Sequence, residues 1–287
     1  MFGLLEHPKI ARSQALANEI AAWLRERGET VWQGSVWDEA GLAAQMAGWQ
    51  MVIVLGGDGA ILRVARAAAP LGVPIFSVNL GKVGFLSEAQ PEEWPQRLAQ
   101  ALQGDFWLER RLMIRARLWR AGLAQADVTA LNEVVVGRGS QARVIHLELF
   151  VDDDPVTRYT ADGVIAATPT GSTAYALAAG GPILPPELEN FLLVPVAPHL
   201  SLDRALVLPE NATVRLRVTM DHEAVLTVDG QIGLRLESGD EIVIERADYD
   251  CLFVRVNQRR YFYQRLVQGL RVGDPQPASD GASQGEG

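Results

Sequence analysis

The stretch from Met51 to Leu55, MVIVL, is apolar at every position. A strand with one face in water alternates apolar and polar residues, so an unbroken apolar run predicts a strand covered on both faces. The sequence on either side agrees, because residues 7–29 and 60–70 carry apolar residues at helical spacing and end near Gly28 and Pro70. We therefore predict an α/β sheet with crossover helices for the first part of the chain.

The hydrophobic pattern changes after about Phe106. Segments such as 112–121, LMIRARLWRA, and 144–153, VIHLELFVDD, alternate apolar and polar residues between Gly, Asp or Asn turns. Period-two strands at this spacing predict an antiparallel β-sandwich. With the boundary near residue 105, the predicted parts of the chain are an α/β domain, a β-rich domain and a disordered tail rich in Gly, Ser and Pro. Their ranges are 1–104, 105–254 and 273–287.

Composition excludes several classes of protein. One cysteine, Cys251, cannot form an internal disulfide or a Cys-based zinc cluster, and its strand context predicts a packed thiol. The four histidines show no metal-ligand spacing. A net charge of -9 argues against a broad nucleic-acid surface. There is no apolar run of the roughly 18 residues that span a membrane, and no signal-peptide pattern, so we expect a cytoplasmic protein without membrane or nucleic-acid partners.

The residues GGDG, 56–59, join the predicted strand to the next helix. Bare N–H groups at a helix start attract phosphate, and Gly56, Gly57 and Gly59 would let the backbone approach a polyphosphate closely. Asp58 would repel phosphate, so its presence makes sense if it holds a metal ion or accepts a proton from an attacking hydroxyl. The alternative is that Asp58 only caps the helix.

A second glycine-rich segment, DGVIAATPTGSTAYALAAGGPI, covers residues 162–183. It predicts a strand, a tight loop PTGST and a short helix inside an otherwise β-rich region. The hydroxyl groups of the loop lie beside exposed backbone N–H groups, and Tyr175 offers an aromatic face for a base or ribose. The alternative is a glycine-bounded helix that plugs the end of the sandwich.

Three shorter motifs add polar groups. LNEVVV, 131–136, places Asn132 and Glu133 at a strand entrance, where adjacent side chains point to opposite faces. NLGKVGFL, 79–86, supplies the cation of Lys82 and the ring of Phe85. VDGQ, 228–231, predicts a type I′ hairpin turn.

These motifs, in this order, resemble the NAD kinase family from about residue 50 to residue 231. The resemblance implies ATP-dependent 2′-phosphorylation of NAD⁺ to NADP⁺ with a divalent metal, usually Mg²⁺. It implies a phosphofructokinase-like α/β domain joined to a β-sandwich domain, with the active site in the cleft between them. It also implies a homodimer or homotetramer, and a C-terminal segment, 255–272, that packs back on the first domain.

The resemblance assigns roles by position. Asp58 matches the catalytic aspartate that also contacts NAD, with Gly59 as the neighbouring contact. Phe85 matches a residue beside the adenine, and Asn132 and Glu133 match residues that hold ribose hydroxyls. The expected NAD site also includes Asp162, near the nicotinamide end, and Thr173, Ala174, Tyr175 and Ala178. The ATP phosphates are expected at Gly56, Gly57, Gly59 and Lys82.

The chain departs from the family pattern at two positions, and these departures leave other functions open. Ala60 stands where the family often has Thr, which removes a hydroxyl that could touch the ATP phosphate. Ala178 stands where Ser is frequent, and the lost hydrogen bond weakens NAD binding by about 0.5–1.5 kcal/mol. The rival functions are a lipid kinase of the same broad fold, which would show an apolar cleft, and a non-catalytic NAD or ADP-ribose sensor.

Overall fold

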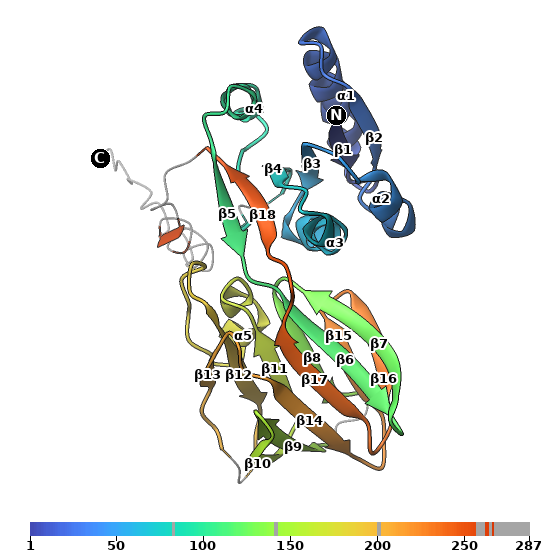
Figure 1. Ribbon diagram of the computed structural model, residues 1–287, viewed down its shortest axis with the longest axis vertical. Helices are drawn as coiled ribbons and strands as arrows, with labels where there is room; N and C mark the ends of the chain where they lie inside the picture. Colours follow the sequence, from blue (N-terminus) through green and yellow to red (C-terminus); the bar gives the residue numbers. More distant parts are fainter. Residues whose placement is uncertain (82–83, 141–142, 200–201, 257–261, 264–265, 267–287) are drawn as a thin grey trace, which may run out of the picture.

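The protein has an α/β lobe and a β lobe that are stacked along the long axis of the molecule (Figure 1). The computed structural model describes residues 1–81, 84–140, 143–199, 202–256, 262, 263 and 266. Within these residues the strands form three six-stranded sheets, one in the α/β lobe and two in the β lobe. None of the helices in these ranges is long and apolar enough to cross a membrane.

The sheet of the α/β lobe has the strand order β2-β1-β3-β4-β18-β5. Neighbours from β2 to β18 are parallel, and β5 runs antiparallel to β18. The apolar run at Met51 is buried along its whole length, as predicted, because helices cover both faces of the sheet. The strands are β1 (Phe2–Glu6), β2 (Val31–Ser35), β3 (Met51–Gly56), β4 (Ile75–Asn79), β5 (Trp107–Arg111) and β18 (Cys251–Arg255).

Four helices cover the two faces of this sheet. On one face, α1 (Ala11–Glu26) and α4 (Trp94–Leu102) pack on residues such as Leu4 and Ile53. On the other face, α2 (Glu39–Gln45) and α3 (Asp58–Ala68) pack on Leu5, Val52 and Val54. The predicted helix ends are confirmed: the backbone of Gly28 is left-handed with φ of 83°, and Pro70 lies in a 3₁₀ turn after α3.

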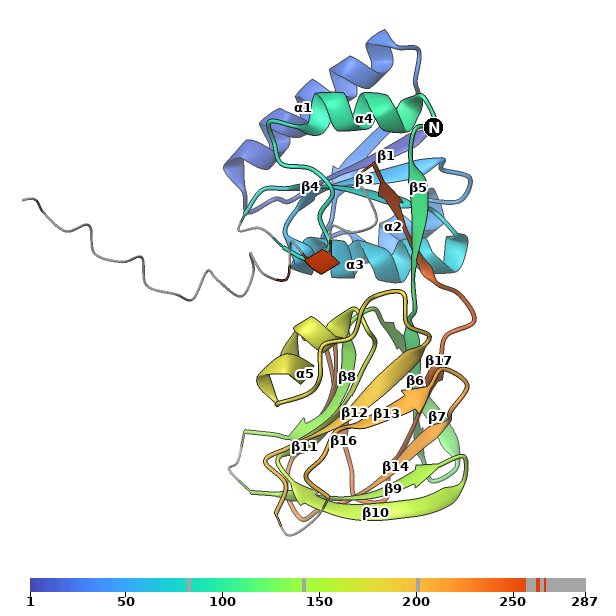
Figure 2. The same ribbon diagram turned by 90° about the vertical axis from the view of Figure 1, so that its left-hand side faces the viewer.

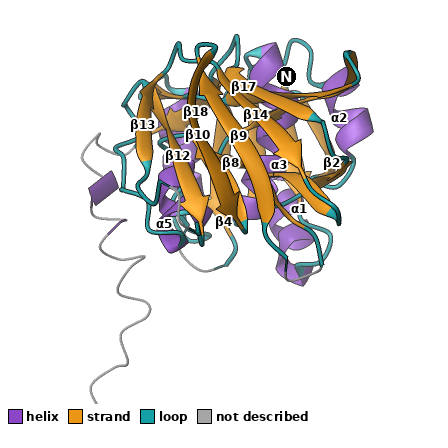
Figure 3. Ribbon diagram, turned by 90° about the horizontal axis from the view of Figure 1, so that it is seen from below, coloured by secondary structure: helices purple, strands orange, loops and turns teal. Residues whose placement is uncertain are grey.

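The β lobe is a sandwich of two antiparallel sheets, and its strands lie in front of the helices of the α/β lobe when the molecule is seen from below (Figure 3). Alternating residues of both sheets meet in one apolar core that includes Ile114, Leu147, Val136 and Leu226. The first sheet contains β10 (Asp154–Ala161), β9 (Ile145–Val151), β14 (Val214–Thr219), β17 (Glu241–Arg246), β6 (Ile114–Arg120) and β7 (Leu123–Ala130). The second contains β13 (Leu206–Pro209), β12 (Asn190–Val196), β11 (Gly163–Ala167), β8 (Glu133–Arg138), β15 (Ala224–Val228) and β16 (Ile232–Leu236).

Two neighbouring strands, β5 and β18, carry the chain between the lobes, and we call them the hinge strands (Figure 1). Both belong to the α/β sheet. The chain therefore leaves the α/β sheet after Arg111 and rejoins it at Cys251, whereas the predicted domain boundaries were at residues 105 and 254. Cys251 is buried, as expected, and burial raises the pKa of its thiol. Apart from 262, 263 and 266, the chain after residue 256 lies outside the described residues, including the predicted tail.

Candidate active site

The two glycine-rich motifs face each other across the junction of the lobes. α3 lies on the side of the α/β lobe nearest the β lobe, and the short helix α5 (Tyr175–Ala178) lies at the near end of the β lobe (Figure 2). Asp58 is the first residue of α3. The sequence motifs that were expected to share a cleft therefore come from facing ends of the two lobes.

Asp58 points away from its own helix. The residue that caps α3 is Gly57, and the Asp58 carboxylate instead accepts hydrogen bonds from the loop after β4. The amide of Phe85 donates to Oδ2 at 2.8 Å and the amide of Leu86 donates to Oδ1 at 3.3 Å. Each carboxylate oxygen can accept more than one hydrogen bond, so both keep acceptor capacity. The interpretation of Asp58 as only a helix cap is wrong, because its side chain holds a distant loop.

Gly84 lies directly against this carboxylate. A Cβ added to Gly84 would come within 3.0 Å of Asp58 side-chain atoms, closer than real Cβ contacts. Glycine is therefore required here by close approach, and the backbone of Gly84 is not left-handed. The loop 84–86 and the Asp58 side chain form one packed unit.

A pocket of about 270 Å³ lies beside the start of α3 and is lined in part by Gly57, Gly59 and Ala60. The same pocket includes His7, Trp37 and Arg63. Trp37 is 46% exposed, and two cations lie over its ring, Lys9 at 4.5 Å and Arg63 at 4.6 Å from the ring centroid. Positive charge and the first amides of α3 make this pocket suited to an anionic group.

The other predicted phosphate residues lie apart from this pocket or cannot be placed. Gly56 is buried at the end of β3, where a Cβ would collide with the Cβ of Ala60, so its role is to let α3 start close to the strand. Lys82 lies outside the described residues. Ala60 lines the pocket with a methyl group, at the position where a hydroxyl was expected from the resemblance.

Asn132 and Glu133 are held by Asp229, at the tip of the β15–β16 hairpin. The buried Asp229 carboxylate accepts hydrogen bonds from the amides of Leu131, Asn132 and Glu133 at 3.1, 2.8 and 3.2 Å. Asp229 and Gly230 have positive φ angles of 49° and 63°, which confirms the predicted type I′ turn. The turn therefore also fixes the entrance of β8.

Glu133 is a buried acid with an unsatisfied oxygen. It is 7% exposed, and its Oε2 has no hydrogen-bond partner among the described residues. Burial raises the pKa of Glu133 to about 7, the nearby Asp229 charge adds to the rise, and a hydrogen bond from the Tyr175 amide opposes it. An orphaned buried acceptor beside Tyr175 is suited to a ligand hydroxyl.

This shift predicts a pH dependence of stability. The folded-state pKa of Glu133 lies above its ordinary value of 4.5, so its contribution to stability is fully present below pH 4.5 and is lost as pH rises through 7. The expected loss is about 3 kcal/mol. Urea unfolding of the wild type and of Glu133→Gln, measured between pH 4.5 and 7.5, should show the difference in unfolding free energy changing by this amount. A constant difference would contradict the assignment.

The hairpin tip also joins the lobes. Gln231 donates to the carbonyl of Gly59 at 2.7 Å and accepts from Arg66 at 2.8 Å. Arg66, on α3, lies 3.7 Å from the Asp229 carboxylate. The GGDG loop is thereby connected through α3 and the hairpin to Asn132 and Glu133.

The PTGST loop packs on the same entrance of β8. The amide of Thr168 donates to the Asn132 carbonyl at 2.9 Å, and the Thr168 hydroxyl donates to the Leu131 carbonyl. Gly171 lies so close to the Asn132 backbone that a Cβ would not fit. Thr173 Oγ1 donates to the Thr170 carbonyl, and Ala174 follows directly before α5. The loop therefore braces the β8 entrance.

A second pocket, of about 330 Å³, is lined by residues that include Asp162 and Tyr175. Asp162 pairs with Arg138 at 2.9 Å, and Tyr175 is half exposed. Ala178 is exposed at the end of α5. The predicted nicotinamide-end residue and the predicted aromatic face therefore share one hollow of the β lobe.

Metal ligands are sparse. Across the described ranges, no group of three or more His, Cys, Asp or Glu side chains could hold a metal ion. Mg²⁺ in nucleotide sites is usually bound by substrate phosphates and only one or two carboxylates. The residues near the GGDG loop fit a metal ion that arrives with a triphosphate.

Sequence reasoning missed several residues of the cleft. Asp229 and Gln231 were interpreted as turn chemistry, although a glutamine directly after Asp-Gly at a hairpin tip was a usable signal. Arg66 is eight residues after Asp58, which places it two turns along α3. Trp37 had no local signal, because it lies in a segment that matched no motif.

Comparison with known proteins gives a consistent result. Residues 11–106 match the ATP-NAD kinase N-terminal domain, and residues 131–256 match the ATP-NAD kinase C-terminal domain. The NAD kinase of Chloroflexus aurantiacus is 41% identical over 268 residues, which cover 93% of this chain and 97% of that protein. The NAD kinase of Dehalococcoides mccartyi is 40% identical over 270 residues, covering 94% and 95%.

Solved structures have the same architecture. The crystal structure of an NAD kinase from Archaeoglobus fulgidus in complex with ATP is 28% identical, with a TM-score of 0.77 and coverage of 94% of this chain and 99% of that chain. The yeast NADH kinase complexed with NADH shares the fold, with a TM-score of 0.80, 23% identity and coverage of 97% and 89%.

Proposed function

The chain belongs to the NAD kinase family and transfers the γ-phosphate of ATP to the 2′-hydroxyl of the adenosine ribose of NAD, and we propose that Asp58 accepts the proton of that hydroxyl. The 2′-oxygen bonds to the γ-phosphorus as the bond to the leaving ADP oxygen breaks. The hydroxyl proton passes to the Asp58 carboxylate. The amides of Phe85 and Leu86 fix the orientation of that carboxylate while leaving acceptor capacity.

NAD would bind from the Asp58 side to the Asp162 side of the β lobe. The orphaned Oε2 of Glu133 accepts a ribose hydroxyl, and Asn132 lies beside it on the same strand entrance. Phe85 contacts the adenine, and Tyr175 and Asp162 line the hollow for the remainder of the dinucleotide. Thr173, Ala174 and Ala178 belong to the same chain segment as Tyr175 and complete the NAD site. These roles follow the family resemblance, and the connected hydrogen bonds around Asp229 support them.

ATP would place its phosphates in the pocket of Gly57, Gly59 and Arg63. A divalent metal ion, such as Mg²⁺, would be held mainly by the triphosphate itself beside the GGDG loop, where it would supply partial neutralisation of the phosphate charge. Lys9 and Arg63, which both lie over the ring of Trp37, add positive charge beside this pocket, in which Ala60 supplies no hydroxyl. We also propose a cytoplasmic homodimer or homotetramer, as the family resemblance implies.

The donor pocket predicts a selective effect on ATP. Arg63→Met should raise the KM for ATP about tenfold or more, because a charge-assisted hydrogen bond contributes about 1.5–3 kcal/mol. The KM for NAD should change little. Arg97→Met, on the remote helix α4, is the matched control for loss of an arginine from the same lobe. Equal increases in both KM values for Arg63→Met would place Arg63 elsewhere.

The observation that carries this proposal is the carboxylate of Asp58, held by two loop amides at the junction of the lobes. Purified protein with ATP, Mg²⁺ and NAD⁺, coupled to an NADP-specific dehydrogenase, tests it directly. NADP⁺ formation that requires both ATP and the metal is the expected result. NAD binding without turnover would indicate a sensor.

A further inference from the structure

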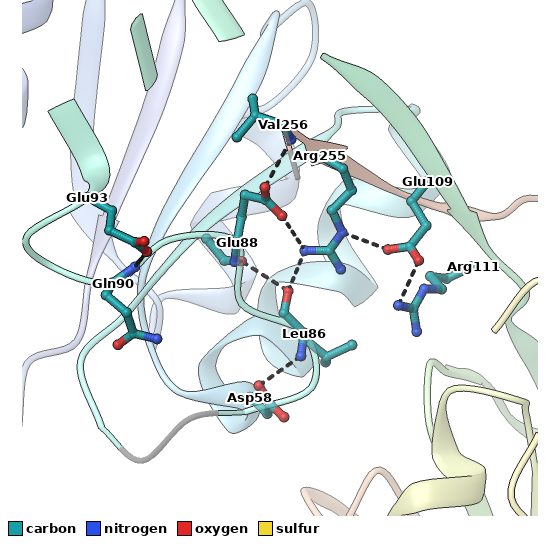
Figure 4. A network of polar contacts seen from close by, with 10 residues as sticks. Asp58, Leu86, Glu88, Gln90, Glu93, Glu109, Arg111, Arg255 and Val256 are labelled. Carbon is teal, nitrogen blue, oxygen red and sulfur yellow. Dashed lines mark hydrogen bonds and ion pairs between the residues drawn. The ribbon is translucent and has the colours of Figure 1, made fainter. Parts of the chain in front are cut away.

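A buried network of four charged side chains lies on the hinge strands and the loop after β4 (Figure 4). Glu109, on β5, accepts from Arg111 at 2.9 Å and from Arg255 at 2.7 Å. Arg255, on β18, also donates to the Leu86 carbonyl at 2.9 Å and to Glu88 at 3.2 Å. The four residues are at most 9% exposed, so two guanidinium and two carboxylate groups are paired away from water.

The charge state of Glu109 is set by its partners. Burial acts to raise the pKa of this carboxyl, but the guanidinium groups of Arg255 and Arg111 outweigh burial and lower the pKa to about 2. Glu109 is therefore ionised at neutral pH and can hold both arginines at once through its two oxygens. It is the central bridge between the two hinge strands.

The network ends at both halves of the candidate active site. At one end, Arg255 binds the carbonyl of Leu86, whose amide donates to Asp58 at 3.3 Å. At the other end, Arg111 donates to the hydroxyl of Thr170 at 3.2 Å, in the PTGST loop of the β lobe. One continuous set of contacts thus joins Asp58 to the loop that braces the β8 entrance.

Stability does not explain this network well. Buried ion pairs carry a large desolvation cost, and apolar residues of similar volume are often as stable or more stable in the same place. What the four charges supply in addition is defined geometry, because a bridging guanidinium fixes both the distance and the angle between its acceptors.

We propose that Arg255 and Glu109 are positioning residues for phosphoryl transfer, which hold Asp58 of the α/β lobe in register with the PTGST loop of the β lobe. The inference rests on the proposed role of Asp58 as proton acceptor. Arg255 and Glu109 do not touch the substrates. They act through the Leu86 peptide and through Arg111.

The first test is Arg255→Lys, which keeps the charge but loses the planar fork that reaches Glu109 and the Leu86 carbonyl together. We expect kcat to fall about 10²-fold, the effect of misplacing a reacting group by about 1 Å. The KM values for ATP and NAD should change little. Glu109→Gln, which can no longer accept from both arginines as an anion, should lower kcat in the same way.

A double-mutant cycle separates positioning from a merely structural role. If Arg255 acts through Asp58, then Arg255→Lys should cause no further loss of kcat when Asp58 is already Asn. If Arg255 has only a structural role, the fold-losses of kcat caused by the two substitutions should multiply in the double variant. The matched control is Arg120→Lys, which breaks a bidentate pair with the buried Asp240 in the β lobe, at 2.9 and 2.8 Å, and should leave kcat unchanged.

The outcomes distinguish this inference from the proposed function. Near-normal turnover in Asp58→Asn alone would reject the role of Asp58. Two results would overturn only the positioning role, provided that kcat collapses in Asp58→Asn. One is a normal kcat in Arg255→Lys, and the other is a further loss of kcat when Arg255→Lys is added to Asp58→Asn. If neither Arg255→Lys nor Glu109→Gln yields folded protein by circular dichroism, the network serves folding and the proposal is overturned.

Discussion

Asp58→Asn is expected to lower kcat by about 10²–10⁴-fold, the range found when a positioned proton acceptor is lost. An amide cannot take the proton of the ribose hydroxyl, although its oxygen can still accept from the Phe85 amide. The side chain keeps its volume and the 2.8 Å hydrogen bond from Phe85, and it loses only the longer contact with the Leu86 amide at 3.3 Å, so the pocket and the loop 84–86 should stay in place. NAD binding, measured by calorimetry, should therefore be preserved while the coupled assay loses its signal.

The matched control for this substitution is Asp152→Asn. Asp152 also accepts a backbone hydrogen bond, from Thr213 at 2.8 Å, but in the exposed turn between β9 and β10. Its φ of 50° is one that asparagine tolerates well. Turnover of this variant should match the wild type. Near-normal turnover in Asp58→Asn would mean that another group accepts the proton.

Gly84→Ala is also expected to cause a large loss of turnover. The added methyl group would occupy space that the Asp58 carboxylate now fills, so either the loop 84–86 or the carboxylate must move. A shift of about 1 Å at a reacting group costs on the order of 10²-fold in rate. The backbone of Gly84 is not left-handed, so the loss would come from the side chain and not from backbone strain.

The control for this change is Gly233→Ala, on β16. A Cβ there would meet the Val225 side chain at 3.8 Å, an ordinary van der Waals contact. Both variants should be checked for cooperative thermal unfolding before their rates are compared. Full activity in a folded Gly84→Ala protein would show that the carboxylate works equally well from a displaced position.

The features predictable from sequence were those with a local physical cause. The apolar run at Met51 required cover on both faces, and the positive φ angles at Asp229 follow from turn chemistry. GGDG and PTGST were recognisable because glycine permits close approach, and the structure shows such approach at Gly171. These signals depend on neighbours in the chain, so one sequence was enough to find them.

The missed features depend on contacts between distant segments. The strand at Cys251 was predicted, but its pattern could not show that it adds to the α/β sheet. The segment WLERR, 107–111, contains Glu109 and Arg111, and nothing in its pattern predicts that they are buried. Both are buried because Glu109 accepts hydrogen bonds from Arg111 and from Arg255. The predicted turn was a sufficient reason for an aspartate at position 229. Nothing in the sequence therefore indicated its three hydrogen bonds to the distant amides of residues 131–133.

The path of the hinge strands has a consequence for the order in which the protein can fold during synthesis. Residues 114–246 form the β lobe without interruption, so this lobe can close as soon as it leaves the ribosome. The α/β sheet cannot, because β4 must wait for β18 until about 170 further residues have been made. Until then the edge of β4 lacks its native neighbour, which makes this edge the point where a nascent chain is most exposed to mispairing.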